Sequence, residues 1–195
     1  MNIYAKSICK ERVKMLKQCF DNVREKHPLV HNITNYVTVN DVANILLACG
    51  GSPIMADDSG EVEDITSICQ GLNINIGTLN KNTIPSMFLA GKKANVLGHV
   101  VLLDPVGAGA SGLRTRTANE LVRDIKFTVI RGNISEIRTL MEGRGNTKGV
   151  DADLADAVTE ENLDETIGKL KAFSEATGSV IAVTGAIDLV ADSET

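Results

Sequence analysis

The sequence contains no tryptophan, only two tyrosines and four phenylalanines, and no run rich in lysine and arginine. Nucleic-acid binding requires a concentrated positive surface, whereas this chain carries a net charge of −5. No apolar run approaches the roughly 20 residues of a membrane-spanning helix, and the N-terminal segment lacks the unbroken apolar core of a secretion signal. These absences argue against nucleic-acid binding, membrane insertion and secretion, and they predict a cytoplasmic protein.

Cysteine is scarce and scattered. The four cysteines, at positions 9, 19, 49 and 69, form no C-x-x-C pair. Zinc sites and disulfide frameworks depend on paired or closely spaced cysteines, so the sequence predicts neither. We expect the four side chains to be small buried groups in a reducing compartment.

The apolar residues that are present are mainly Ile, Val, Leu and Ala, which suit buried parallel strands covered by helices. The 195 residues are enough for one domain over 1–195. Short apolar runs between helix-like segments predict strands over 28–33, 52–55, 72–77, 99–104, 127–131 and 179–185. It predicts helices over 34–50, 61–71, 83–98, 113–125, 133–143 and 161–178. The prediction is α/β, a mostly parallel sheet with helices on both faces, because right-handed crossovers connect such strands.

Two further segments stand apart from this alternation. We predict that the N-terminal segment forms an ordinary packing helix that ends before Pro28. Its apolar residues recur along one stripe, opposite a face of charged residues. That stripe comprises Cys9, Val13, Leu16, Phe20 and Val23. Residues 143–165 are polar, acidic and glycine-bearing, which indicates a surface excursion between two helices.

The residues that follow the predicted strands are the first place to search for function, because ligands of parallel α/β sheets gather at the carboxyl ends of the strands. Polar types recur there. In chain order these residues are His31, Asn32 and Asn35, then Met55, Asp57 and Asp58, then Asn75 and Gly77, then Asp104, then Arg131, Asn133 and Glu136, and finally Thr184 and Gly185.

The stretch DPVGAGASG contains a literal G-x-G-x-x-G, at Gly107, Gly109 and Gly112. A dinucleotide-binding turn places its first glycine almost directly after the strand and a pyrophosphate on the helix N-terminus. Here Asp104 and Pro105 intervene, so a carboxylate would stand beside that site. The motif therefore favours a magnesium-bound phosphate near Asp104, with a helix cap or a turn as the structural alternative for this residue.

The stretch RGNISE supplies further candidates. Arg131 can pair with phosphate oxygens through its planar guanidinium, and Asn133 with Glu136 can present an amide and a carboxylate to hydrated Mg²⁺. Asn133 and Glu136 also have the spacing of a capping box, and both interpretations can hold together. Thr184 follows a buried strand, where its hydroxyl can meet a phosphate or stabilise a turn.

A small-molecule pocket is predicted from residues at the ends of the first two predicted strands. Asn35, Val37 and Met55 can form an apolar pocket with one polar handle, the usual composition of such a site, although core packing is the alternative for Val37 and Met55. We interpret His31 as a structural residue at a strand end, because no partner nucleophile is visible.

Seven blocks, LVHNITNYV, GGSPIM, NINIGTL, LDPVGAGAS, IRGNISEI, KGVDA and VTGAID, resemble in type and order those of the hydroxyethylthiazole kinase family, a thiamine-salvage branch of the ribokinase-like superfamily. The resemblance covers about residues 25–192. It implies a three-layer αβα fold and ATP-dependent phosphorylation of the hydroxyl of 4-methyl-5-(2-hydroxyethyl)thiazole, with Mg²⁺. It also implies a homotrimer whose active sites lie between adjacent subunits.

Matched residue by residue, the resemblance assigns two groups of ligand contacts. It implies a thiazole site formed by Asn35, Val37 and Met55. It implies an ATP and phosphate site formed by Asp104, Arg131, Glu136 and Thr184, of which Asp104 and Glu136 also hold the metal.

The family carries a second glycine-rich turn, G-[TA]-G-C, downstream of the VTGAID block, whose cysteine takes the place of the catalytic base of the wider superfamily. This sequence ends at DLVADSET, before any such turn or the C-terminal helices that follow it. We therefore nominate no catalytic base, and we expect a truncated chain with weak turnover at best. A sheet left uncovered on one face would expose apolar residues and favour association.

Three alternatives remain open at this point. The chain could be a non-catalytic protein that binds a thiazole or a nucleotide, or a subunit that completes its site with another chain. It could also be a ribokinase-like kinase of another small alcohol, such as a pyrimidine or pyridoxal precursor. The HNITN and SPIM blocks favour thiazole.

Overall fold

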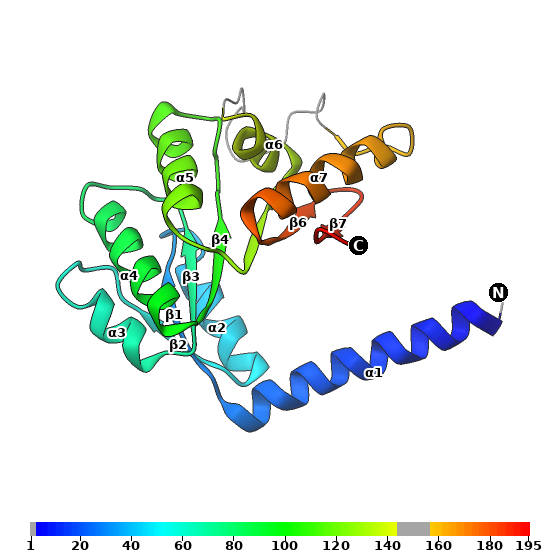
Figure 1. The fold of residues 1–195 in the computed structure, drawn as a ribbon. Coiled ribbons are helices and arrows are strands. Elements are labelled where there is room, and N and C mark those ends of the chain that lie inside the picture. Colours follow the sequence, from blue (N-terminus) through cyan, green and yellow to red (C-terminus); the bar gives the residue numbers. More distant parts are fainter. Residues whose placement is uncertain (1–2, 144–156) are drawn as a thin grey trace.

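The computed structural model describes residues 3–143 and 157–195 (Figure 1). Its helices are α1 (Ile3–Lys26), α2 (Val39–Cys49), α3 (Val62–Ile68), α4 (Thr83–Leu97), α5 (Gly112–Asp124), α6 (Ile134–Glu142) and α7 (Leu163–Thr177). Its strands are β1 (Leu29–Ile33), β2 (Ser52–Met55), β3 (Gly71–Asn75), β4 (Val100–Asp104), β5 (Val129–Asn133), β6 (Val180–Thr184) and β7 (Leu189–Ala191). Every predicted helix and strand is present, which confirms the α/β class.

The described strands form one sheet in the order β2-β1-β3-β4-β5-β6-β7. Neighbours from β2 to β6 pair in parallel, as predicted. The edge strand β7 pairs antiparallel with β6 and is not among the predicted strands. Its three residues are too few to display an alternation, and it returns through a turn in which the Gly185 N–H donates to Asp188 Oδ1 at 2.9 Å.

The largest difference in a predicted boundary lies at the start of α2, which begins at Val39 rather than at residue 34. The side-chain oxygen of Asn35 accepts hydrogen bonds from the backbone N–H groups of Val37 and Thr38, both at 3.0 Å. This local turn satisfies amides that a helix would otherwise use, so the helix starts only after it.

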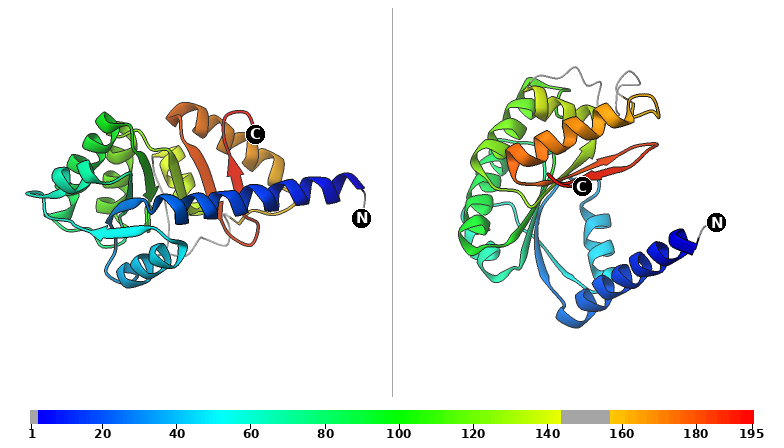
Figure 2. Two further views of the ribbon diagram at one scale, coloured as in Figure 1. Left: turned by 90° about the horizontal axis from the view of Figure 1, so that it is seen from below. Right: turned by 45° about the vertical axis from the view of Figure 1, so that its right-hand side comes forward.

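One face of the sheet carries the hydrophobic core. Alternate residues of the central strands, among them Leu72, Ile74, Val101, Leu103, Ile130 and Ile181, are at most 2% exposed. Helix α4 packs on β3 and β4, α6 on β5 and β6, and α7 on β6 and β7, while α3 and α5 pack beside α4. The core therefore lies between the sheet and the layer from α3 to α7 (Figure 2).

The opposite face carries α2, which packs against β2 (Figure 2). Helices are therefore present on both sides of the sheet, as predicted. Further along the sheet, the residues on this face other than the buried Asn75 are only partly buried or exposed, and Val100 of β4 and Val190 of β7 are 57% and 72% exposed. We call this the open face, defined by Asn73, Asn75, Val100, Leu102, Asp104, Val129, Arg131, Ala182, Thr184 and Val190.

Two sequence expectations about packing are wrong. Helix α1 forms but is not an ordinary packing helix, because it extends away from the sheet in Figures 1 and 2, and Val13, Leu16 and Phe20 are 48 to 60% exposed. Amphipathic periodicity predicts a helix without specifying its packing partner. Cys19 on this helix is exposed, whereas Cys69 is buried as expected. Most of the acidic segment 143–165 lies outside the described residues.

Candidate functional site

A cavity of about 520 Å³ lies at the carboxyl ends of β3, β4 and β5, between the open face and the segment that leads into α2. Four of the predicted site residues line it together, namely Asn35, Val37, Asp104 and Arg131. The remaining lining residues are Thr34, Thr38, Val42, Asn73, Asn75, Gly77 and Val106. The predicted small-molecule side and the predicted phosphate side therefore share one space.

The glycine-rich loop after β4 forms one wall of this cavity. Gly107 and Gly109 have φ angles of 72° and 92°, a region that favours glycine. A Cβ atom on Gly107 would also collide with the guanidinium of Arg114. The loop is fixed further by the Gly107 N–H, which donates to Glu136 Oε1 at 2.8 Å. The glycines thus serve a tight, buried turn beside Asp104.

Glu136 is buried and its carboxylate accepts two backbone hydrogen bonds. Oε1 accepts from Gly107, and Oε2 accepts from the N–H of Asn133 at 2.9 Å. The Asn133 side chain accepts in return from the Glu136 N–H at 2.9 Å, which confirms the capping box at the start of α6. Burial raises the pKa of Glu136, and the two backbone donors partly offset that increase. This carboxylate therefore joins the glycine-rich loop to α6.

Asp104, the last residue of β4, presents the carboxylate that lines the cavity. The guanidinium of Arg131 donates to Asp104 Oδ2 at 3.4 Å, and the Arg131 side chain is half exposed. Burial raises the pKa of Asp104, while the positive charge of Arg131 and a hydrogen bond from Asn75 act in the opposite direction. The site therefore holds an anion and a cation side by side at the edge of the sheet.

A chain of amide side chains lines the rest of the cavity. Asn35 Nδ2 donates to Asn75 Oδ1 at 3.1 Å, and the Gly77 N–H donates to the same oxygen at 2.8 Å. Two residues earlier on β3, Asn73 Nδ2 donates to Asn32 Oδ1 at 3.2 Å. The polar wall is thus built by residues on successive strands.

A model described as the hydroxyethylthiazole kinase family matches residues 20–195. The chain belongs to this family. It is 67% identical over 178 residues to a hydroxyethylthiazole kinase of Clostridium acetobutylicum, covering 91% of this chain and 65% of that protein. It is 53% identical to the hydroxyethylthiazole kinase of Ruminiclostridium cellulolyticum, of which it covers 66%. The chain thus spans slightly less than two thirds of the length of these relatives.

The same family is found among solved structures. The hydroxyethylthiazole kinase protein of Pyrococcus horikoshii OT3 superposes with a TM-score of 0.80 at 37% identity, covering 93% of this chain and 65% of that one. A pyridoxal kinase of Staphylococcus aureus has a TM-score of 0.55 at 14% identity, which is a likeness of fold alone. These neighbours confirm the three-layer ribokinase-like fold that the resemblance implies.

Three predicted site residues of this hydroxyethylthiazole kinase family member lie outside the lining of the cavity. Met55 ends β2 beside Asn32 and is 37% exposed. Thr184 ends β6 beside Asn133, and its hydroxyl donates to the Gly132 carbonyl at 3.4 Å. Glu136 lies behind the glycine-rich loop that forms the wall. The roles proposed for Met55 and Thr184 therefore need contacts beyond this cavity.

His31 has the contacts of a structural residue. One ring nitrogen lies 2.9 Å from the Thr66 hydroxyl and the other lies 2.9 Å from the Ala56 carbonyl. Burial lowers the pKa of His31, so the neutral ring is favoured in this environment. Its contacts therefore support the structural interpretation.

Asn73 and Arg114 are not among the residues that the sequence singles out, and Asn75 appears only as a polar residue at a strand end, without an assigned role. In the stretch LNINI, asparagine alternates with leucine and isoleucine, and this period of two is the sequence signal that one face of the strand is polar. Arg114 gives no such signal. Its guanidinium donates to the Gly77 carbonyl at 2.7 Å and to the Val106 carbonyl at 3.3 Å, and so links two loops that are 29 residues apart.

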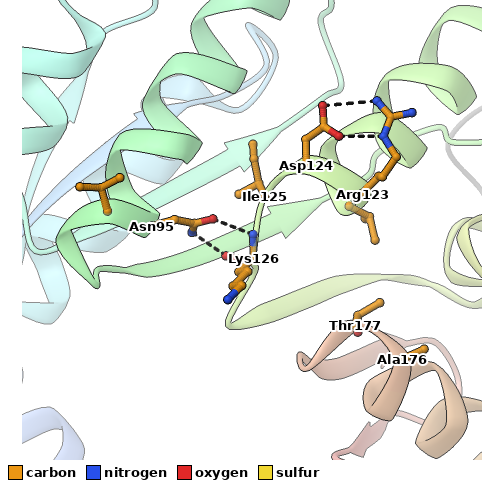
Figure 3. A pocket seen from close by; sticks show the side chains of 9 residues that line it. Asn95, Arg123, Asp124, Ile125, Lys126, Ala176 and Thr177 are labelled. Carbon is orange, nitrogen blue, oxygen red and sulfur yellow. Dashed lines mark hydrogen bonds and ion pairs between the residues drawn. The ribbon is translucent and has the colours of Figure 1, made fainter.

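A second cavity of about 690 Å³ lies near the amino end of β5, away from the carboxyl ends of the strands (Figure 3). There the Asn95 side chain donates to the Lys126 carbonyl at 2.8 Å and accepts from the Lys126 N–H at 2.7 Å. Arg123 forms an ion pair with Asp124 in the same place. These polar groups fix the connection between α5 and β5, so the carboxyl edge remains the better candidate site.

Residues 3–143 and 157–195 lack two kinds of structural feature. No group of three or more histidine, cysteine, aspartate or glutamate side chains is clustered there for a metal ion. No helix in that part of the chain is long and apolar enough to cross a membrane.

Proposed function

We propose that this protein phosphorylates the hydroxyl of 4-methyl-5-(2-hydroxyethyl)thiazole with ATP. The observation that carries the proposal is the single cavity lined by both Asn35 with Val37 and Asp104 with Arg131. A phosphoryl-transfer site must hold an alcohol and a phosphate within one space, and it works mainly by positioning them and neutralising charge. Membership of the family and a relative 67% identical support the choice of substrate.

The thiazole side of the proposed site is apolar. Val37 and Val42 line the cavity there, and Asn35 supplies a polar edge. An aromatic ring with a short alcohol fits such a lining, because apolar contacts hold the ring and few polar groups fix its orientation. Met55 would extend the same side from β2.

The phosphate side of the proposed site is charged. Arg131 is half exposed, so its guanidinium is accessible to phosphate oxygens. Thr184, at the end of the neighbouring strand, would donate its hydroxyl to the nucleotide. The supply of ATP in the cytoplasm makes that compartment the expected place of this activity.

Mg²⁺ fits the residues of this site. The ion prefers oxygen ligands, keeps several waters, and is commonly held by one or two carboxylates together with phosphates. Asp104 lines the cavity with a carboxylate, whereas both oxygens of Glu136 already accept backbone hydrogen bonds. We therefore assign Asp104 as the direct or water-mediated ligand and Glu136 as a contact through water. When bound, the ion would neutralise charge on the transferred phosphate.

We further propose that the protein forms a homotrimer with active sites between subunits. Val37 lines the cavity and is 88% exposed, so the cavity is open on that side. A neighbouring subunit that covered Val37 would complete the apolar wall. Sedimentation at several protein concentrations tests this, because a monomer at all concentrations would contradict it.

The proposed reaction is tested by turnover and binding measured on the same preparation. Calorimetry with the thiazole alcohol and with Mg-ATP should detect both ligands, and an assay of ATP-dependent phosphorylation should detect the product. Asp104→Asn should reduce turnover by at least about tenfold with little change in thiazole affinity. The matched control is Asp57→Asn, since Asp57 also follows a strand but is exposed and does not line the cavity.

The possible results separate the hypotheses. Turnover that falls in Asp104→Asn but not in Asp57→Asn supports the proposed reaction. Binding of both ligands without turnover would favour a binding protein, and binding of neither would contradict the proposal. Faster turnover with a pyrimidine or pyridoxal precursor would identify a kinase of another alcohol.

A further inference from the structure

Asn75 occupies an unusual position at the end of β3. Its side chain lies on the open face, is 8% exposed, and lines the cavity. In the register of the sheet it stands directly beside Asp104 of β4. A buried amide is costly unless both its carbonyl and its NH₂ group find partners, so each contact of this side chain has a physical reason.

The two ends of the Asn75 side chain face different parts of the cavity. Its oxygen accepts from Asn35 Nδ2 at 3.1 Å and from the Gly77 N–H at 2.8 Å. An oxygen can only accept, so the NH₂ group is left to face the neighbouring strand, where Asp104 stands beside Asn75 in the register of the sheet. The amide orientation is thereby fixed by two donors to its oxygen, and the Asp104 carboxylate is its neighbour in register on β4.

Asn35 extends this connection to α2. Its own oxygen accepts from the N–H groups of Val37 and Thr38, and its NH₂ group is the donor to Asn75. The chain of contacts therefore runs from the start of α2 through Asn35 and Asn75 to Asp104. Arg131 follows at the far end, through its ion pair with Asp104.

We infer that Asn75 is a positioning residue that couples the small-molecule side of the cavity to the phosphate side. The inference rests on the proposed function, because it takes Asn35 with Val37 as the alcohol side and Asp104 with Arg131 as the nucleotide side. When a ligand orders Asn35, the Asn75 amide holds the Asp104 carboxylate in one orientation. Each ligand then binds more tightly in the presence of the other, as thermodynamic linkage requires.

Asn73 provides a matched control. It is the same residue type on the same strand and face, two positions earlier, and it lines the same cavity. Its NH₂ group donates to Asn32 at 3.2 Å rather than to Asp104. A change at residue 73 therefore perturbs the cavity wall without cutting the connection between Asn35 and Asp104.

The test measures coupling between the two ligands. Calorimetry gives the dissociation constant of the thiazole alcohol with and without Mg²⁺ and a non-hydrolysable ATP analogue. We expect the analogue to tighten binding by about fivefold or more in the wild type and in Asn73→Leu. In Asn75→Leu that factor should fall to about one. A factor preserved in Asn75→Leu, or lost equally in Asn73→Leu, would overturn the inference.

Asn75→Asp keeps the test decisive if Asn75→Leu does not fold. This variant retains an oxygen for Asn35 and Gly77, but it loses the NH₂ group and places a second carboxylate beside Asp104. We expect it to bind the thiazole alcohol alone with less than about a twofold change, and to lose the coupling factor. Retained coupling in this variant would show that the donor end of Asn75 is not needed, and so would contradict the inference.

A ligand-free measurement separates this inference from the proposed function. The side-chain NH₂ resonances of Asn75 should shift in Asp104→Asn, while those of Asn73 should stay in place. If the wild type binds neither ligand, the proposed function fails, yet this spectrum still reports whether Asn75 contacts Asp104. Unchanged Asn75 resonances in Asp104→Asn would contradict the connection itself.

Discussion

Adjacent residues of β4 belong to different environments. Val101 and Leu103 are fully buried beneath the helical layer, whereas Leu102 and Asp104 lie on the open face, where Asp104 lines the cavity. Because side chains alternate along a strand, a single segment contributes both to the core and to the site. The covered face supplies hydrophobic stabilisation, which leaves the other face available for polar groups.

The open face is itself divided along the strands. At the carboxyl ends it presents Asn75, Asp104 and Arg131, and the Arg131 guanidinium donates to Asp104. At the opposite ends it presents apolar residues such as Val100, which is 57% exposed. Polar side chains thus gather where parallel strands bring their carboxyl ends together, and this is where α/β proteins bind their ligands.

The largest contrast between the faces is expected from truncating neighbouring leucines. Leu103→Ala removes a fully buried side chain and leaves a cavity, so the free energy of unfolding should fall by about 2–5 kcal/mol. Leu102→Ala, on the open face, should cost less than about half as much because that side chain keeps contact with solvent. Urea denaturation of both variants measures the difference. Equal losses would contradict the assignment of the two faces.

A smaller effect on stability is expected at Glu136, which joins helix α6 to the glycine-rich loop of the site. Glu136→Ala leaves the N–H groups of Gly107 and Asn133 without their buried acceptor, so the unfolding free energy should fall by about 1–3 kcal/mol. Glu142→Ala, on the exposed end of the same helix, should stay within about 0.5 kcal/mol of the wild type. Thermal unfolding can measure both. No loss in Glu136→Ala would show that the loop does not depend on this carboxylate.

The contrast between the faces also decides what could be predicted from the sequence. Alternation reveals the covered face of β3, where Leu72 and Ile74 flank Asn73, but not that of β4, where residues 100–103 are all apolar. It does not reveal β7, which is too short to alternate, or the exposure of α1, which depends on a packing partner. Local spacing therefore predicts helices and strands better than it predicts which of them pack against each other.

The site could be predicted only where residues follow a strand. Asp104, Arg131 and Asn35 do, and they line one cavity. Arg114 does not, since it lies within α5 and reaches Gly77 through its long side chain. Its contact depends on how two loops fold against each other, and no spacing along the chain encodes that. The role of Glu136 could be foreseen as a capping box, but its bond to Gly107 could not.

A further prediction concerns the charge of Asp104 on the open face. Here a substitution should raise the unfolding free energy, whereas the substitutions above lower it. Burial raises the pKa of Asp104 above its ordinary value of 3.8, so the folded protein binds this proton more tightly than the unfolded chain does. Stability therefore falls as the pH rises through the folded pKa. Asp104→Asn should stabilise the ligand-free protein at neutral pH, by about 1.4 kcal/mol for each unit of the pKa difference.

The pH dependence of the unfolding free energy distinguishes the contribution of Asp104 from that of other ionisable groups. The advantage of Asp104→Asn over the wild type should be largest at neutral pH and should disappear toward the ordinary value of 3.8. His31 acts in the other direction, since its lowered pKa removes stability as the pH falls below 6.5, but it does so equally in both proteins. Urea midpoints from pH 4 to 8 measure the difference. A destabilised variant at pH 7 would contradict the prediction.

The smallest effect on stability is expected from the apolar end of the open face. Val190 lies on the edge strand β7 and is 72% exposed, so Val190→Lys should change the unfolding free energy by no more than about 0.5 kcal/mol. A lysine on an edge strand opposes pairing with another chain, so light scattering should report less self-association. The adjacent Leu189 packs against the core on the covered face, and Leu189→Lys should be the more destabilising change. If Val190→Lys were as destabilising as Leu189→Lys, the division of β7 between two faces would be wrong, because only a buried position makes a charge costly.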